Sequence, residues 1–176
     1  VPTADVLAEN QYNLAMARSE MSDWDDRAYM GNIGLQNAME AGVYVTDPDN
    51  GSGETLLNLK HQFQAPQPGR MSLAVGISDL TNEIDTSVYV AASQAIEPQI
   101  LGTDLTVHAG FGGGWIDDFF CGVEAELSPA ITVIGEHFNS DVSVGARWQI
   151  WDHFVVDGGY MQTDEWSVKV SYNYPQ

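Results

Sequence analysis

The sequence predicts an all-β protein: a twelve-stranded antiparallel up-and-down transmembrane β-barrel with short loops, formed by residues 1–176 as a single β-barrel domain. Apolar residues alternate with polar or small ones through most of the chain, which is the period of a β-strand. Clusters of Gly, Pro, Asn and Asp interrupt this alternation at short intervals. No run of about 18 apolar residues is present, so the pattern excludes a transmembrane helix but not a transmembrane barrel.

Twelve segments show the alternation, and each is eight to ten residues long. They are 11–19, 28–37, 40–47, 55–64, 70–78, 86–95, 103–111, 118–127, 131–138, 141–150, 154–161 and 165–174. Turn-forming residues separate them, as in the Pro-Asp-Asn-Gly sequence at 48–51 and the Gly-Gly-Gly sequence at 112–114, which we expect to be a loop. Ala, Leu, Met and Glu mix at 3–10 and 34–41, where a helix is the alternative.

The large side chains and the small or polar side chains of these segments occupy opposite faces. The clearest apolar faces are Met71, Leu73, Val75 and Ile77; Leu105, Val107, Ala109 and Phe111; Val142, Val144, Ala146, Trp148 and Ile150; and Trp166, Val168, Val170, Tyr172 and Tyr174. The opposite face is mostly Ser, Gly, Ala, Asn and Gln, whereas the outer surface of a soluble barrel carries more charge. Small residues suit a crowded barrel interior and large apolar residues suit lipid, so we expect the apolar face to point outward.

Charged residues inside the predicted strands follow the polar register, which is the interior face of the expected barrel. We predict that seven of them line a pore: Lys60, Glu124, Glu126, Glu136, Arg147, Asp157 and Lys169. Arg18 has apolar parity but stands at a strand end, where a long side chain can reach the membrane surface.

Aromatic residues are expected at the two membrane interfaces. With both termini at one end, as twelve strands require, that end collects Tyr12, Phe63, Trp148, Trp151, Phe154, Tyr172 and Tyr174. The other end collects Trp24, Tyr29, Tyr44, Trp115, Phe119, Tyr160 and Trp166.

The chain has 25 Asp and Glu residues against 6 Lys and Arg, a formal net charge of −19, which argues against nucleic acid as a partner. More than half of the acids fall in turns at the end opposite the termini. This predicted acidic rim contains Asp23, Asp25, Asp26, Asp79, Glu83, Asp85, Asp117, Asp118, Asp164 and Glu165, with Glu20, Asp47, Asp49, Glu54 and Asp141 beside them. Such a mouth concentrates cations and repels anions. The alternative is that the acids only keep the chain soluble during export.

The acidic rim also suggests a metal site, because Asp47, Asp49 and Glu54 could offer oxygen ligands to Ca²⁺. The spacing is not that of an EF-hand, and an ordinary turn is the alternative. Otherwise no cofactor is expected. The single cysteine, Cys121, excludes an internal disulfide.

One cluster raises the question of catalysis, since His137 and Ser140 flank a tight turn. Proximity in sequence does not establish a base and a nucleophile in hydrogen-bonding geometry. We therefore predict no catalytic residues, and a protein that is not an enzyme.

The chain resembles porin-like outer-membrane β-barrels of Gram-negative bacteria. The resemblance rests on 1–7 (Val-Pro-Thr-Ala-Asp-Val-Leu), 57–63 (Leu-Asn-Leu-Lys-His-Gln-Phe), 73–77 (Leu-Ala-Val-Gly-Ile, then Asp79 and Leu80) and 89–93 (Tyr-Val-Ala-Ala-Ser). It implies a location in the bacterial outer membrane after removal of a signal peptide, which a first residue other than Met also favours.

Together these features predict a porin-like passive channel for small cationic or neutral solutes, with a preference for cations. Membrane lipid is the expected partner around the barrel, and a homo-oligomer is compatible with the pattern. Two alternatives stay open. One is a non-conducting structural or surface-assembly barrel, and the other is a soluble ligand-binding β-barrel with its apolar face inward.

Overall fold

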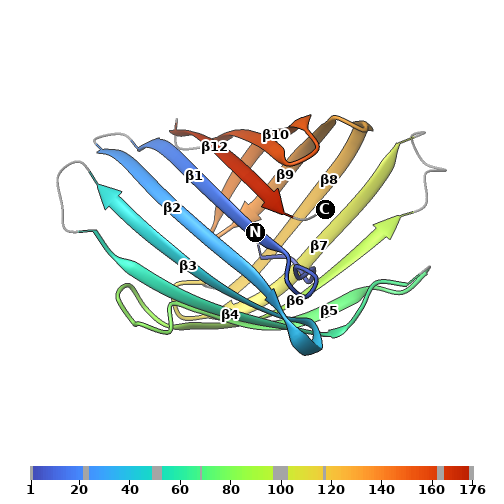
Figure 1. The fold of residues 1–176 in the computed structure, drawn as a ribbon, viewed down its shortest axis with the longest axis horizontal. Coiled ribbons are helices and arrows are strands. Elements are labelled where there is room, and N and C mark those ends of the chain that lie inside the picture. Colours follow the sequence, from blue (N-terminus) through green and yellow to red (C-terminus); the bar gives the residue numbers. More distant parts are fainter. Residues whose placement is uncertain are drawn as a thin grey trace.

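The computed structural model describes residues 2–21, 24–48, 53–67, 69–96, 103–116, 118–161 and 165–174. Within them, twelve antiparallel strands close into a barrel in which β1 pairs with β12 (Figure 1). The strands are β1 (Tyr12–Met21), β2 (Trp24–Leu35), β3 (Met39–Pro48), β4 (Thr55–Gln64), β5 (Ser72–Ser78), β6 (Ser87–Ile96), β7 (Asp104–Gly113), β8 (Asp118–Ser128), β9 (Ile131–Phe138), β10 (Asp141–Trp151), β11 (Phe154–Met161) and β12 (Glu165–Tyr174). The predicted fold is confirmed.

The predicted boundaries hold for most strands, and those of β4, β9, β11 and β12 agree at both ends. The largest difference is at β2, which begins at Trp24 instead of residue 28. Pairing of β1 with β2 continues to Met21 and Trp24, so Asp25 and Asp26 lie in the strand and not in a turn. Backbone hydrogen bonds can continue strand pairing through residues with polar side chains. The alternation of side chains therefore does not show where such a strand begins.

Neither segment with a helical alternative forms an α-helix. The 34–41 region contains a single 3₁₀ turn, η1 (Gln36–Ala38), where Asn37 and Ala38 have positive φ angles and the chain reverses from β2 into β3. Residues 2–8 enter the interior of the barrel before β1 begins, where Ala4 forms hydrogen bonds with the side chains of Ser93 and Gln62. No described helix is long and apolar enough to cross a bilayer.

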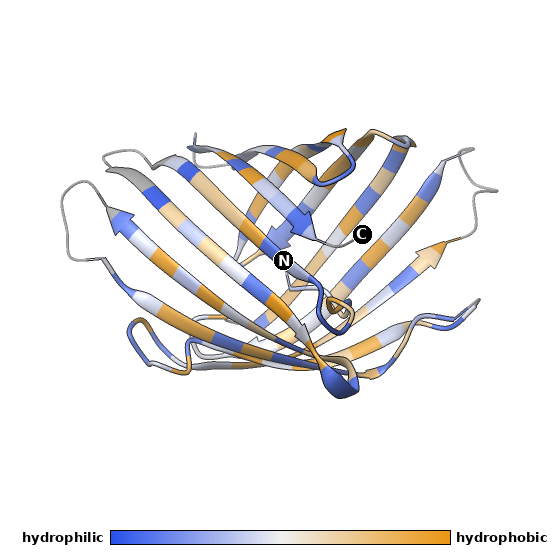
Figure 2. Ribbon diagram, in the orientation of Figure 1, coloured by the Kyte–Doolittle hydropathy of each residue, from blue (hydrophilic) through white to orange (hydrophobic). Residues whose placement is uncertain are grey.

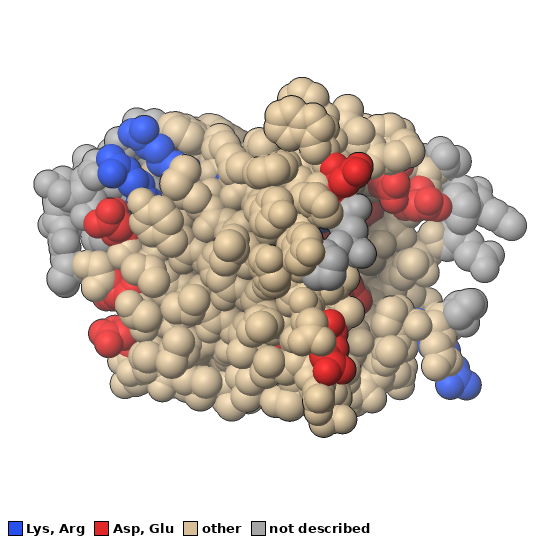
Figure 3. All heavy atoms as spheres, in the orientation of Figure 1, with Lys and Arg blue, Asp and Glu red and all other residues tan. Residues whose placement is uncertain are grey.

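The predicted sidedness is also observed. Val144 and Val168 are 58% and 40% exposed on the outer face, while Arg147 and Lys169 on the opposite parity are half-buried. Alternating colours along the strands show the same two faces (Figure 2). Charged side chains gather near the two ends of the face drawn in Figure 3, and a broad uncharged band separates them. The soluble ligand-binding barrel needs the apolar face inward, so the structure contradicts that alternative.

Part of the interior is packed with apolar side chains. Its core, here called the dry side, consists of Ala4, Ala74, Ala91, Ile116 and Phe120, with Tyr89, Trp115 and Phe138 packed against it. The connection from β7 to β8 reaches this core, because Ser87 Oγ accepts a hydrogen bond from Ile116 N at 2.9 Å. Two predictions therefore need correction. Trp115 packs inside the barrel against Phe138, not at a membrane interface, and the Gly-Gly-Gly sequence lies partly in β7, which ends at Gly113.

Candidate functional site

Three charged residues on neighbouring strands form the centre of the candidate site. Arg147 of β10, Asp157 of β11 and Lys169 of β12 are register partners, so their side chains lie at the same level of the interior wall. Arg147 Nε is 2.8 Å from Asp157 Oδ1, and Lys169 Nζ is 3.0 Å from Asp157 Oδ2. This charged triad places one carboxylate between two cations, the cross-strand order that opposite charges favour.

Hydrogen bonds and short charge contacts extend the triad around the wall. Arg147 Nη1 lies 3.3 Å from Glu124 Oε2 on β8, so the guanidinium spans the intervening β9. Glu124 Oε1 is 3.9 Å from His108 Nε2 on β7, and His108 Nδ1 is 2.7 Å from Ser93 Oγ on β6. The resulting charged ladder runs from β12 to β6 through Lys169, Asp157, Arg147, Glu124, His108 and Ser93.

Two pockets adjoin the triad, and both are lined by all three of its residues. One, of about 320 Å³, extends toward Glu136, Ser143 and Ser167, and the other, of about 290 Å³, extends toward the residues Asn13, Gln149, Ser171 and Asn173. The first set lies toward the β9–β10 and β11–β12 connections and the second toward the chain termini. The pockets therefore lie on opposite sides of the triad, and together with it they are here called the polar path along β1 and β10–β12.

The remaining predicted lining residues are distributed elsewhere. Lys60 of β4 pairs with Glu40 of β3 at 3.4 Å, away from the triad. Glu136 lines one of these two pockets, whereas Glu126 is exposed and opposes Asp104 in the pairing of β7 with β8. Sequence reasoning missed Glu40, although the strand register of 40–47 would have placed it on the polar face.

One member of the predicted acidic rim is not a free surface acid. Asp79 is 0% exposed, and its carboxylate accepts hydrogen bonds from the backbone N–H groups of Glu83, Ile84 and Asp85 at 2.8–3.1 Å. Burial acts to raise the pKa of Asp79, but these bonds and one from the Thr81 hydroxyl outweigh it and hold the pKa below its ordinary value. Asp79 therefore organises the β5–β6 connection.

The other rim residues are placed as follows. Glu83 and Asp85 are exposed in the β5–β6 connection, Asp118 is exposed at the start of β8, and Glu165 is half-buried at the start of β12. Asp25 and Asp26 belong to β2, while Asp23, Asp117 and Asp164 lie outside the described residues. The function of the rim stays a prediction.

The proposed calcium ligands are only partly described. Asp47 is exposed near the end of β3, and Glu54 N donates a hydrogen bond to Thr46 Oγ1 at 2.9 Å. Asp49 lies outside the described residues. Across the described part of the chain, no group of three or more His, Cys, Asp or Glu side chains is arranged to hold a metal ion, so calcium binding stays an untested prediction.

His137 and Ser140 line one pocket of about 320 Å³ at the β9–β10 connection, together with Asp118. Asn139 and Ser140 both have positive φ angles, which is typical of a tight hairpin turn. Among the described side chains, no hydrogen bond joins His137 to Ser140, so the arrangement lacks the link between base and nucleophile that catalysis requires.

Comparison with known proteins gives similarity in fold only. No protein-family model matches the sequence, and no curated protein matches it. The solved structure of the KdgM porin superposes with a TM-score of 0.63 at 10% identity, covering 93% of this chain and 99% of that one. The NanC porin gives 0.63 at 8% identity, covering 94% and 100% of the two chains.

An enzyme with a similar barrel is also found. The outer membrane phospholipase A of Escherichia coli superposes with a TM-score of 0.51 at 8% identity, covering 97% of this chain and 92% of that one. The barrel shape therefore does not by itself separate a channel from an enzyme. In its fold, the chain is similar to the porin-like β-barrels of the outer membrane.

Proposed function

We propose that this protein is a passive channel of a bacterial outer membrane, reached after removal of a signal peptide, and that it admits small cationic or neutral solutes with a preference for cations. The observation that carries the proposal is the polar path along β1 and β10–β12, where two pockets meet at the charged triad. A barrel that served only as a packed body gains little from ionised groups in its interior, because removing each charge from water costs free energy. In this proposal the protein is not an enzyme.

The charges of the interior support cation preference. Its three cations, Lys60, Arg147 and Lys169, all pair with carboxylates. Among the described residues, the interior acids Glu40, Glu124, Glu136 and Asp157, with Asp5 of the N-terminal segment, exceed these cations by two, and the net charge of the whole chain is −19. The potential of such a wall extends over a Debye length of about 8 Å at physiological salt, which is enough to act across a narrow pore.

The same charges bear on the solute. The KdgM porin has a structure in complex with oligogalacturonate, which is a polyanion. An acidic interior repels polyanions, so we propose that small neutral and cationic solutes, and not acidic oligosaccharides, pass through this chain.

The test is electrical. Purified protein inserted into planar bilayers between two KCl concentrations should give discrete conductance steps and a reversal potential displaced toward the K⁺ equilibrium potential. A reversal potential on the Cl⁻ side would refute cation preference. No conductance from correctly folded barrels at any voltage would refute the channel itself.

One observation favours a second function, a non-conducting structural or surface-assembly barrel. The dry side fills part of the interior with apolar residues, and the N-terminal segment adds to it. That function predicts native-sized homo-oligomers or filaments that carry no current, which size measurement of the extracted protein together with the bilayer recording would reveal.

A further inference from the structure

The N-terminal segment, residues 2–8, lies inside the barrel and is held by side chains of four strands. Ser93 Oγ of β6 accepts a hydrogen bond from Ala4 N at 2.9 Å, and Gln62 Nε2 of β4 donates one to the Ala4 carbonyl at 2.8 Å. Glu40 Oε2 of β3 accepts one from Leu7 N at 2.9 Å. Ser72 Oγ of β5 donates one to Asp5 Oδ1 at 3.3 Å.

Small residues in the barrel wall leave room for the N-terminal segment. Ala4 is 0% exposed and packs with Ala74 and Ala91, where larger side chains would fill the same space. At Gly34, a Cβ atom would collide with the carbonyl oxygen of Ala8, so only glycine lets the chain approach β2 so closely. The wall is therefore a binding groove for an extended chain, and its occupant is the protein's own N-terminal segment.

The way in which the segment is held allows it to leave without opening the barrel. Within the described residues, 2–7 form no backbone hydrogen bond with any strand, and the barrel ladder closes between β1 and β12 without them. The anchors are side-chain hydrogen bonds, and Ala4 is the one residue of the segment that is fully buried. Release exposes Ala4 and the covered parts of Pro2, Val6 and Leu7, which is a small share of the apolar surface that unfolding exposes, so its cost is far below that of unfolding.

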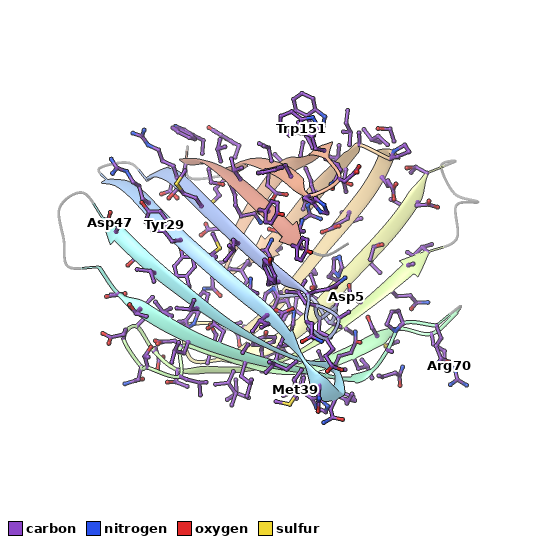
Figure 4. The ribbon with its side chains drawn as sticks, in the orientation of Figure 1. Asp5, Tyr29, Met39, Asp47, Arg70 and Trp151 are labelled. Atoms are coloured by element: carbon purple, nitrogen blue, oxygen red, sulfur yellow. The ribbon has the colours of Figure 1, made fainter. Side chains whose placement is uncertain are left out.

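The segment lies between two spaces in the interior. One, of about 360 Å³, is lined by Pro2 together with Glu40, Lys60 and Trp115. The other, of about 530 Å³, opens toward the end that carries Arg70 and is lined by Asp5 and Ser72. Figure 4 shows Asp5 within the barrel and Arg70 at its end. Neither space includes any residue of the charged triad, so both are separate from the polar path.

We propose that residues 2–8 are a displaceable internal plug, and that their release joins these two spaces into a second path through the barrel. The inference rests on the proposed channel function. With the plug seated, current follows the polar path along β1 and β10–β12. With the plug released, the barrel has two parallel paths and a larger conductance.

The first test deletes residues 2–7 and leaves Ala8, which contacts the β2 wall, in place. We expect the single-channel conductance in KCl to rise at least twofold, with the barrel still showing the heat-dependent gel mobility of a folded outer-membrane protein. Equal conductance of the two folded forms would refute the plug and leave the channel function standing. If neither form conducts, the proposed function fails and the plug inference fails with it.

A second test uses a pair of matched glutamines and does not depend on a deletion. Gln62→Ala removes a donor to the plug, whereas Gln64→Ala removes a donor to the Met71 carbonyl near the barrel end. We expect Gln62→Ala, and not Gln64→Ala, to add brief openings to the larger conductance level. Identical records from the two variants would overturn the plug.

The third test measures release without current. In a Cys121→Ser background, Ala4→Cys should react slowly with a charged methanethiosulfonate, because position 4 of the seated plug is buried against the barrel wall. Adding Gln62→Ala should speed this reaction severalfold, and adding Gln64→Ala should not. A thiol at position 4 that reacts equally fast in all three proteins would show that the segment is not seated in the groove.

Discussion

The two sides of the barrel interior use the same strand pattern and reach opposite results. On the dry side, most inward residues of β5 and β6 are small and buried, namely Ser72, Ala74, Ser78, Ser87, Ala91 and Ser93, and Tyr89 is the large exception. Other parts of the chain fill the space that they leave. On the β10–β12 side, ionised side chains project from the wall, and the space beside them forms two pockets. Small inward residues therefore leave room that other segments of the chain fill, whereas charged inward residues line open pockets.

This difference also explains how the two sides are connected. Ser93 accepts the hydrogen bond from the plug and also contacts His108, which begins the part of the charged ladder that leads to Glu124 and Arg147. The packed side and the charged side are thus in contact through a row of polar groups. We expect substitutions on the packed side to change mainly the stability of the barrel, and substitutions on the charged side to change mainly its ion selectivity.

The largest expected effect is on the dry side. Phe120→Ala removes a fully buried ring that contacts Tyr89 and Phe138, and we expect a loss of about 3–5 kcal/mol in the free energy of unfolding. Denaturant-induced unfolding in detergent micelles measures this change. Phe119→Ala is the matched control, because Phe119 is exposed on the outer face and should cost far less in the same micelles. Equal losses in both variants would show that the dry side is not a packed core.

The next effect is on the charged side. Asp157→Asn removes the carboxylate between Arg147 and Lys169 and leaves two cations beside the polar path. We expect a shift of the reversal potential toward Cl⁻ and a loss of roughly 2 kcal/mol in stability, the order of a hydrogen bond to a charged group. Asp152→Asn, in the exposed β10–β11 connection, carries the same charge change and should shift the potential much less. The opposite ranking would place the selective region at the end of the barrel.

A smaller effect is expected at the Asp79 connection, outside the strands. Because hydrogen bonds hold the pKa of Asp79 below its ordinary value of 3.8, its stabilisation is complete above that value and is lost as the pH falls through the lower, folded-state pKa. Proteolysis of 79–86 by pepsin should therefore accelerate below about pH 3.8, after correction for the activity of pepsin on an unfolded substrate. In Asp79→Asn, cleavage should be fast at every acidic pH. A wild-type cleavage rate that did not depend on pH would contradict this assignment.

The sequence predicted what depends on a local period. The twelve strands follow from alternation, and the shared inward face of Arg147, Asp157 and Lys169 follows from parity, whereas their common level comes from the strand register seen in the structure. Parity cannot reveal which segments outside the strands occupy the interior. Whether residues 2–8 enter the interior depends on the volume that the strands enclose. The sequence pattern of the segment itself carries no information about that volume.

Two further differences have the same physical origin. Trp115 and Asp79 stand in connections between strands, where the sequence suggested surface positions. Both are drawn inward by groups distant in sequence or across a turn: Asn139 Nδ2 donates to the Trp115 carbonyl, and Asn58 Oδ1 accepts from Asp79 N. The Asp-x-Thr-Asn sequence at 79–82 was the available signal for the closed loop, since Asp and Asn side chains bond to nearby backbone N–H groups.

The smallest effect is expected from a change that keeps the charge of the ladder and alters only its geometry. In Arg147→Lys, the cation remains, but a single ammonium cannot reproduce the fork with which the guanidinium reaches Asp157 and Glu124. We expect a loss of about 1 kcal/mol in the free energy of unfolding and an unchanged reversal potential, measured as for Asp157→Asn. The comparison separates charge from bridging: if Arg147→Lys moved the reversal potential as far as Asp157→Asn does, the shape of the ladder, and not its charge, would set the preference for cations.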